Sequence, residues 1–237
     1  TTRGQDPVNS YLAVHDGNGL VVDTGVPLHR DAIRKQAASL VASLDIQVLQ
    51  TRFEPDTMLN LDLFIDDLGA SSVNGGGLYN PLELWDHLAP DQAVDAQFGV
   101  TVRRTEPGQY VQWADGRSVE VIATRHRVLP TYWYFDATAG VLFTSDSFSH
   151  AHLGATEAPV LEDPAELPRG PDLVADLLAK FEWFAGADTA LLRRDLTRSS
   201  VPGTSGQLPL HVDAACAAAP PSTPTTPCFT RRWKRSR

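Results

Sequence analysis

The sequence contains little of what several protein classes require. It has only two cysteines, Cys216 and Cys228, both in a C-terminal segment, so disulfides cannot support its core. No apolar run approaches the ~20 residues that cross a bilayer, and the opening TTRGQDPVNSYL lacks the basic-then-apolar pattern of a secretion signal. We therefore expect a soluble, cytoplasmic protein without a membrane partner. Because the first residue is Thr1 and not Met, we also expect a trimmed N-terminus or a start further upstream.

Positive charge is scarce outside the C-terminus. The net charge is −9, and it becomes −14 when the five positive charges of the last seven residues, RRWKRSR, are left out. An acidic body argues against nucleic acid as a partner. The segment before that end, DAACAAAPPSTPTTPCFT, has the Ala, Pro and Thr bias of chains that bury too little surface to fold. We predict one ordered domain over residues 1–212 and a disordered, basic, low-complexity tail over 213–237.

Apolar periodicity predicts the elements of the first half. The stretch YLAVHDGNGLVVDTG predicts two strands joined by a tight turn. Apolar residues at helical spacing over 30–44 predict a helix, and IQVL predicts a buried strand after it. The same reasoning predicts a helix over 57–68, a glycine-rich loop over 74–77 and a short helix near 81–89.

Residues 98–146 change to strand character. FGVTVRR, QYVQW, SVEVIAT, YWYFD and VLFTSD predict five successive strands of an antiparallel meander, separated by PG, ADG and ATAG turns. An amphipathic helix over 171–185 and a last strand, GQLPLH, follow. Strands in the centre and helices at the flanks predict an α/β architecture with sheet inside and helices outside.

Acidic and imidazole side chains follow four of the predicted strands, at the point where each strand ends. These residues are Glu54, Asp56, His126, Asp146 and His211. Loops beyond strand ends tend to share one crevice, so we expect these side chains to converge. Carboxylates and imidazoles suit iron, manganese or zinc. Three carboxylates in one site raise one another's pKa, so they need a cation, which a metal pair or the guanidinium of Arg52 would supply.

Each of these residues also has an explanation without a ligand. Glu54 and Asp56 could cap the helix that follows them, because acids favour that end of the helix dipole. Asp146 could be an ordinary turn residue, and His126 an exposed histidine at a strand end. His211 borders the predicted tail.

Three stretches resemble those of a known superfamily. VNSYLAVHDGNGLVVDTG resembles the opening hairpin of the metallo-β-lactamase fold, TRFEPDT falls where that fold carries HxHxDH, and YFDATAGVLFTSDSF resembles the strands before its bridging aspartate. The resemblance covers roughly residues 8–212 and implies an αββα sandwich, with two central mixed sheets flanked by helices. Glu54 in place of the second histidine resembles the oxygen-binding diiron subgroup that includes the flavodiiron proteins, with the motif HxExDH.

The resemblance implies a role for each matching residue. The implied metal ligands are Glu54, Asp56, His126, Asp146 and His211, with Asp56 and Asp146 also in catalysis. Arg52 and Thr57 stand where the motif has its two outer histidines. We expect them, with Asp23, to support the site through hydrogen bonds and charge rather than to bind metal. His150 and His152 are candidate replacements for the two imidazoles, although two histidines in a surface loop are more often only solvated.

The implied function is a metal-dependent oxidoreductase with two iron ions, acting on dioxygen or a small oxidised substrate. Its electrons would come from a donor protein, because the sequence has no GxGxxG fingerprint and no flavodoxin-like domain. A zinc hydrolase of an ester, thioester or lactam is the alternative on the same fold, and Glu54 argues against it. The third alternative is a metal-free pseudoenzyme or binding protein, in which Arg52 replaces the metal charge. A homodimer is a further expectation.

Overall fold

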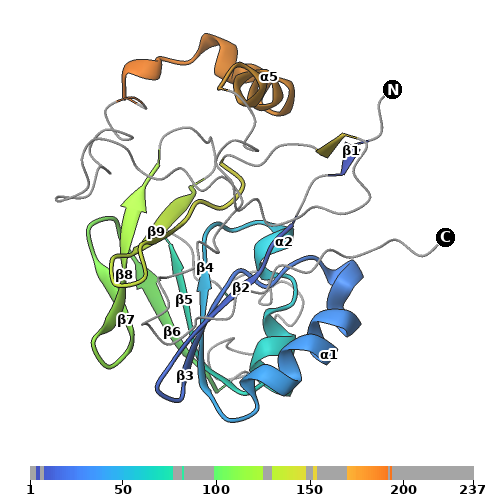
Figure 1. Cartoon of the computed structure of the whole chain (residues 1–237), viewed down its shortest axis with the longest axis vertical. Helices are drawn as coiled ribbons and strands as arrows, with labels where there is room; N and C mark the ends of the chain where they lie inside the picture. The colour runs from blue at the N-terminus through green and yellow to red at the C-terminus, as the bar shows by residue number, and fades with distance from the viewer. Residues whose placement is uncertain are drawn as a thin grey trace, which may run out of the picture.

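The structure is a computed structural model, and it describes residues 4–5, 8–76, 82, 99–124, 130–147, 152–153, 170–191 and 193. Two β-sheets pack face to face, and helices cover the outer face of the first sheet (Figure 1). The predicted α/β architecture built on two sheets is confirmed. Within the residues that the structure describes, no helix combines the length and the apolar character needed to cross a bilayer.

The first sheet has five strands in the order β2-β3-β4-β5-β6. Its strands are β2 (Tyr11–His15), β3 (Asn18–Val22), β4 (Asp45–Gln50), β5 (Ala70–Gly76) and β6 (Thr101–Thr105). The predicted hairpin is confirmed, because β2 and β3 pair antiparallel across a two-residue turn. Asp16 and Gly17 form that turn with φ of 45° and 76°, and a left-handed pair of this kind matches the twist of the flanking strands.

Two predictions for this region are wrong. β6 pairs parallel with β5 and so belongs to the first sheet, not to the meander. The expected glycine-rich loop is also part of a strand, since Asn74 to Gly76 continue β5. β5 lies between β4 and β6 and pairs with both, so ladder hydrogen bonds on its two edges hold this glycine-rich stretch extended.

The second sheet has four strands in the order β10-β9-β8-β7. They are β7 (Tyr110–Ala114), β8 (Arg117–Ala123), β9 (Tyr132–Asp136) and β10 (Val141–Phe143), and all neighbours pair antiparallel. This part of the predicted meander is confirmed. A separate pair joins β1 (Gly4–Gln5) to β11 (His152–Leu153).

The helices are shorter than the sequence predicts. α1 (Arg30–Val41) follows η1 (Pro27–His29) and ends before residue 44. The single helix expected over 57–68 is instead α2 (Pro55–Met58) and a π-helical turn, η2 (Leu63–Asp67). Between them the side-chain amide of Asn60 donates to the backbone carbonyl oxygens of Thr24 at 3.0 Å and Gly25 at 3.1 Å. These contacts tie the chain to the loop after β3 at the point where the regular helix stops.

The helix predicted in the last third of the chain is also shorter than expected. The helix predicted over 171–185 is α5 (Gly170–Lys180) followed by the 3₁₀ turn η4 (Glu182–Gly186). In Figure 1, α5 lies beyond the end of the sheets at which α2 lies. The helix expected near 81–89, the strand expected at GQLPLH and the tail lie outside the described residues.

Two apolar clusters hold these layers together. One lies between the first sheet and its helices, where Val21 and Val48 meet Ile33 of α1 and Phe64 of η2. The other lies between the sheets, where residues of β2, β3 and β4 pack on Trp113, Val121 and Tyr134 of the second sheet. The two faces of β3 and β4 are therefore both buried, which leaves the ends of these strands as the place where polar side chains can gather.

Candidate active site

The candidate site lies where the end of β4 meets the start of β9. Arg52 forms an isolated antiparallel bridge with Thr131, and the Tyr132 amide donates to the Thr51 carbonyl oxygen at 2.8 Å. These backbone contacts join the first sheet to the second beyond the last residue of β4. The side chains that follow β3, β4 and β10 lie around this junction.

Asp23 follows β3 and is buried in the left-handed conformation, with φ of 58°. Its carboxylate accepts two hydrogen bonds from Thr51, from the amide at 2.8 Å and from the hydroxyl at 2.7 Å. Burial raises the pKa of Asp23 to about 7, against the opposing effects of Arg52 and of the Thr51 hydrogen bonds. Asp23 therefore fixes the start of the loop that carries Arg52.

The Arg52 guanidinium lies at the centre of the site. It forms ion pairs with Glu54 at 3.1 Å, with Asp146 at 3.5 Å, and with Asp56. It also donates to the hydroxyl of Ser145. Burial lowers the pKa of Arg52, but the neighbouring carboxylates, of which Asp146 contributes most, outweigh burial and raise it. The guanidinium is thus a permanent positive charge enclosed by carboxylates.

We call Arg52, Glu54, Asp56 and Asp146 the Arg52 cluster. With its three carboxylates ionised, the cluster has three negative charges and one positive charge, so two negative charges are left in excess. Burial raises the pKa of Asp56, Glu54 and Asp146 raise it further by like-charge repulsion, and Arg52 opposes them. The carboxylate side chains retain between 17% and 27% of their exposure, so solvent or a ligand reaches them, whereas Arg52 retains 5%.

Thr57 holds the loop between β4 and α2. Its hydroxyl donates to the Arg52 carbonyl oxygen at 2.6 Å, and its own carbonyl oxygen accepts from the Thr24 hydroxyl at 2.8 Å. Glu54 occupies the N-cap position of α2 and Asp56 lies in the first turn of that helix. The capping explanation that the sequence allowed for the two acids is therefore compatible with their place in the chain.

The structure brings together only part of the predicted ligand set. Glu54, Asp56 and Asp146 converge on Arg52, and Asp23 lies next to them through Thr51. The predicted ligands His126 and His211 lie outside the described residues, as does His150. His152 is described by its backbone alone, in β11.

The described donors do not fit a pair of metal ions. Among the residues that the structure describes, no three His, Cys, Asp or Glu side chains are grouped to hold a metal ion. The guanidinium of Arg52 stands among the carboxylates that would share such an ion, and it has only donor groups. The Thr57 hydroxyl is engaged with a backbone carbonyl.

Sequence reasoning missed Ser145. This residue has φ of 57°, and its hydroxyl oxygen lies 2.8 Å from that of Thr51 and accepts from Arg52. It links Asp23, through Thr51, to the Arg52 cluster. The signal available in the sequence was its position next to Asp146 in the turn after a strand, but that position alone does not say where a hydroxyl points.

The sequence itself matches no family model and no curated protein. Solved structures do match. The rubredoxin oxygen:oxidoreductase of the anaerobe Desulfovibrio gigas superposes with a TM-score of 0.56 and 17% identity, over 78% of this chain and 47% of the other. A fragment of a putative diflavin flavoprotein from Nostoc superposes with a TM-score of 0.54 and 13% identity, over 75% of this chain and 65% of the other.

A variant of the flavo-diiron protein of Thermotoga maritima gives a TM-score of 0.52 and 15% identity, over 81% of this chain and 43% of the other. This chain has the metallo-β-lactamase fold. The match to this chain covers less than half of the Desulfovibrio and Thermotoga chains and about two thirds of the Nostoc fragment. Identities of this size establish the shared fold and leave the chemistry to the residues of the site.

Proposed function

We propose that this chain is a metal-free member of the metallo-β-lactamase fold, a binding protein or pseudoenzyme in which Arg52 supplies the positive charge of the site. The observation that carries this proposal is the guanidinium of Arg52, which pairs with Glu54, Asp56 and Asp146 at once. It supplies a positive charge among three neighbouring carboxylates, which otherwise repel one another.

Two of the positions in the motif TRFEPDT hold groups that do not ligate a metal. Arg52 offers five N–H donors and no lone pair, and Thr57 commits its hydroxyl to the Arg52 carbonyl oxygen. The guanidinium also pairs with all three carboxylates that would otherwise coordinate a metal ion. The absence of two imidazoles and the presence of a guanidinium therefore both weaken metal binding.

The charge of the site favours one class of ligand. The Arg52 cluster has two negative charges in excess, and its partly exposed carboxylates are acceptors. A small molecule that is cationic or rich in hydrogen-bond donors gains from such a site, whereas an anion is repelled. We therefore propose a small cationic molecule as the ligand.

The second candidate is the diiron oxidoreductase. The three carboxylates that converge near Arg52 are the observation that favours it, because iron prefers such oxygen ligands alongside imidazole. His126 and His211 would complete the set of metal ligands, and the Arg52 guanidinium would have to move away from the carboxylates. This version implies an electron-donor protein, dioxygen or a small oxidised substrate, and a homodimer of cytoplasmic chains. The zinc hydrolase would use the same residues with one or two zinc ions.

Elemental analysis of the purified full chain, produced with iron and zinc both supplied, separates these functions. The metal-free proposal expects metal well below one ion per chain, unchanged by the variant Asp146→Ala. Near two irons per chain, lost in Asp146→Ala, would support the oxidoreductase. One or two zincs, lost in the same variant, would support the hydrolase. Either stoichiometric result overturns the metal-free proposal.

A further inference from the structure

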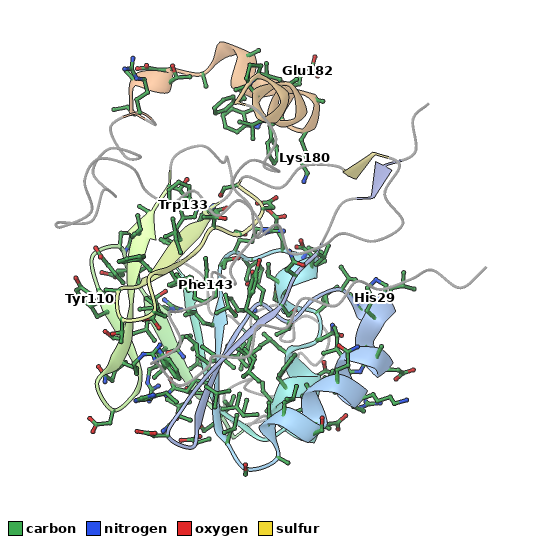
Figure 2. All side chains as sticks on the ribbon, viewed as in Figure 1. His29, Tyr110, Trp133, Phe143, Lys180 and Glu182 are labelled. Carbon is green, nitrogen blue, oxygen red and sulfur yellow. The ribbon has the colours of Figure 1, made fainter. Side chains whose placement is uncertain are left out.

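A cavity of about 70 Å³ lies between the β2–β3 hairpin and α1, on the face of the first sheet opposite to the second sheet. Its apolar wall comes from the strands, from α1 and from η2. The residues of that wall include Leu12, Val21, Ile33, Ala37, Val41 and Phe64. Figure 2 shows His29, which also lines the cavity, at the start of α1, away from Trp133 and Phe143 of the second sheet. No residue of the Arg52 cluster lines the cavity.

Two small residues create this space. Ile33, Ala37 and Val41 follow one another at four-residue intervals on α1, and the middle one has the shortest side chain. Gly25 faces the same space with φ of 75°, and a Cβ atom there would lie 2.9 Å from Ile33 Cδ1. A larger side chain at either position would take up part of the cavity.

Among the residues that the structure describes, those at the rim of the cavity are polar but uncharged. Asn9, Ser10, His29 and Gln36 line it, and the lining given by the structure includes no Lys, Arg, Asp or Glu. Burial lowers the pKa of His29, which favours its neutral imidazole. An ionised ligand would lose its hydration here without gaining a counter-charge.

We propose that this cavity binds a small neutral amphiphile, with an aliphatic body against the wall and one hydroxyl or carbonyl oxygen at the rim. The cavity of about 70 Å³ is larger than the roughly 10 to 15 Å³ that one water molecule needs, so it can hold a small organic molecule. The apolar wall supplies the affinity and the uncharged rim selects against a carboxylate. This ligand is independent of the one proposed for the Arg52 cluster, because the two sites share no residue.

The test is a titration of the full chain with n-pentanol and with pentanoate, which has a similar body and a charged end. Binding is followed through the amide NMR signals of Gly25 and Ala37. We expect saturable shifts of these signals with n-pentanol, and pentanoate binding at least about tenfold weaker. Shifts that do not saturate, or equal affinity for the two molecules, would overturn the proposal.

Two substitutions on the same helix make the test specific. Ala37→Leu fills the cavity and should abolish n-pentanol binding, whereas Ala38→Leu, on the exposed side of α1, should leave it unchanged. If Ala37→Leu does not fold, Val26→Phe narrows the cavity from the loop before η1 and replaces it. Equal n-pentanol binding by the filled and the control variants would also overturn the proposal.

Discussion

Arg52 Nη1 lies 3.5 Å from Asp146 Oδ1, and this ion pair joins the loop after β4 to the turn after β10. The two residues follow strands of different sheets and are distant in the chain. Their contact, with the Arg52–Thr131 bridge, closes the polar end of the β-sandwich. The same guanidinium that pairs with the carboxylates therefore also links the two sheets at the site.

Removing the guanidinium should destabilise the fold. Arg52→Ala leaves three partly buried carboxylates without a counter-charge, and we expect the free energy of unfolding to fall by about 2 to 4 kcal/mol. Urea denaturation at neutral pH measures this loss. The control is Arg34→Ala, whose ion pair with Asp67 at 2.7 Å is largely exposed and should contribute less than about 1 kcal/mol. An equally small loss for Arg52→Ala would show that Arg52 does not balance the cluster.

Stability should depend on pH through Asp23. Its pKa is about 7 in the folded chain against an ordinary 3.8, so the folded state binds this proton more tightly than the unfolded state. The free energy of unfolding therefore falls as the pH rises from about 4 to about 7, by at most about 1.4 kcal/mol per pH unit. The raised pKa of Asp56 adds a slope of the same sign.

The variant Asp23→Asn isolates that slope. Its Oδ1 still accepts from the Thr51 amide, but the group no longer titrates. Denaturation at several pH values should show this variant gaining stability relative to the unmodified chain as the pH rises towards 7. The variant Asp45→Asn, at the exposed start of β4, is the control for the loss of one carboxylate. A difference between Asp23→Asn and the unmodified chain that stays constant with pH would contradict the prediction.

Restoring the histidines of the motif should create metal binding. The double substitution Arg52→His with Thr57→His rebuilds HxExDH, removes the guanidinium and adds two imidazoles to Glu54, Asp56 and Asp146. We expect iron or zinc near stoichiometric amounts by elemental analysis, with circular dichroism to verify folding. The single variant Arg52→Lys keeps a positive charge and should bind no more metal than the unmodified chain. A folded double variant without metal would show that charge is not what keeps metal out.

A second buried ion pair, between Arg117 and Asp136, should contribute to the stability of the fold and not to the candidate site. Arg117 donates to Asp136 at 2.7 Å, lies 5.0 Å from the centre of the Trp113 ring, and is buried in the second sheet. Asp136→Ala leaves this charge unpaired and frees the Ala139 amide, so we expect a loss of about 3 to 5 kcal/mol. Adding Arg117→Met should recover much of that loss in a thermal or urea denaturation experiment. No recovery in the double variant would indicate that the Ala139 hydrogen bond dominates.

The local features of the fold could be predicted because neighbouring residues determine them. The hairpin follows from Asp16 and Gly17, which adopt the left-handed turn that two-residue loops need. The apolar spacing of Ile33, Ala37 and Val41 predicts α1. The acids of TRFEPDT could be assigned to a strand end for the same reason, because the apolar run of the strand gives way to charged residues within a few positions.

The choice of partners could not be predicted in this way. FGVTVRR indicates a strand whichever sheet it joins, and β5, almost 30 residues earlier in the chain, decides that β6 completes the first sheet. Asn74 to Gly76 look like a loop until their neighbours on both edges are known. Strand propensity depends on context, because it reflects packing against neighbours more than an intrinsic preference of the backbone.

The sequence by itself determined the residue types of the site and their places at strand ends: Arg52, Glu54, Asp56 and Asp146. Only the tertiary structure decided that the guanidinium lies among the three carboxylates, that it donates to Ser145, and that Asp23 holds the neighbouring Thr51. Covalent order fixes which groups a loop carries. The balance of burial, charge and hydrogen bonding among segments distant in the chain fixes what those groups meet, and that balance exists only in the folded protein.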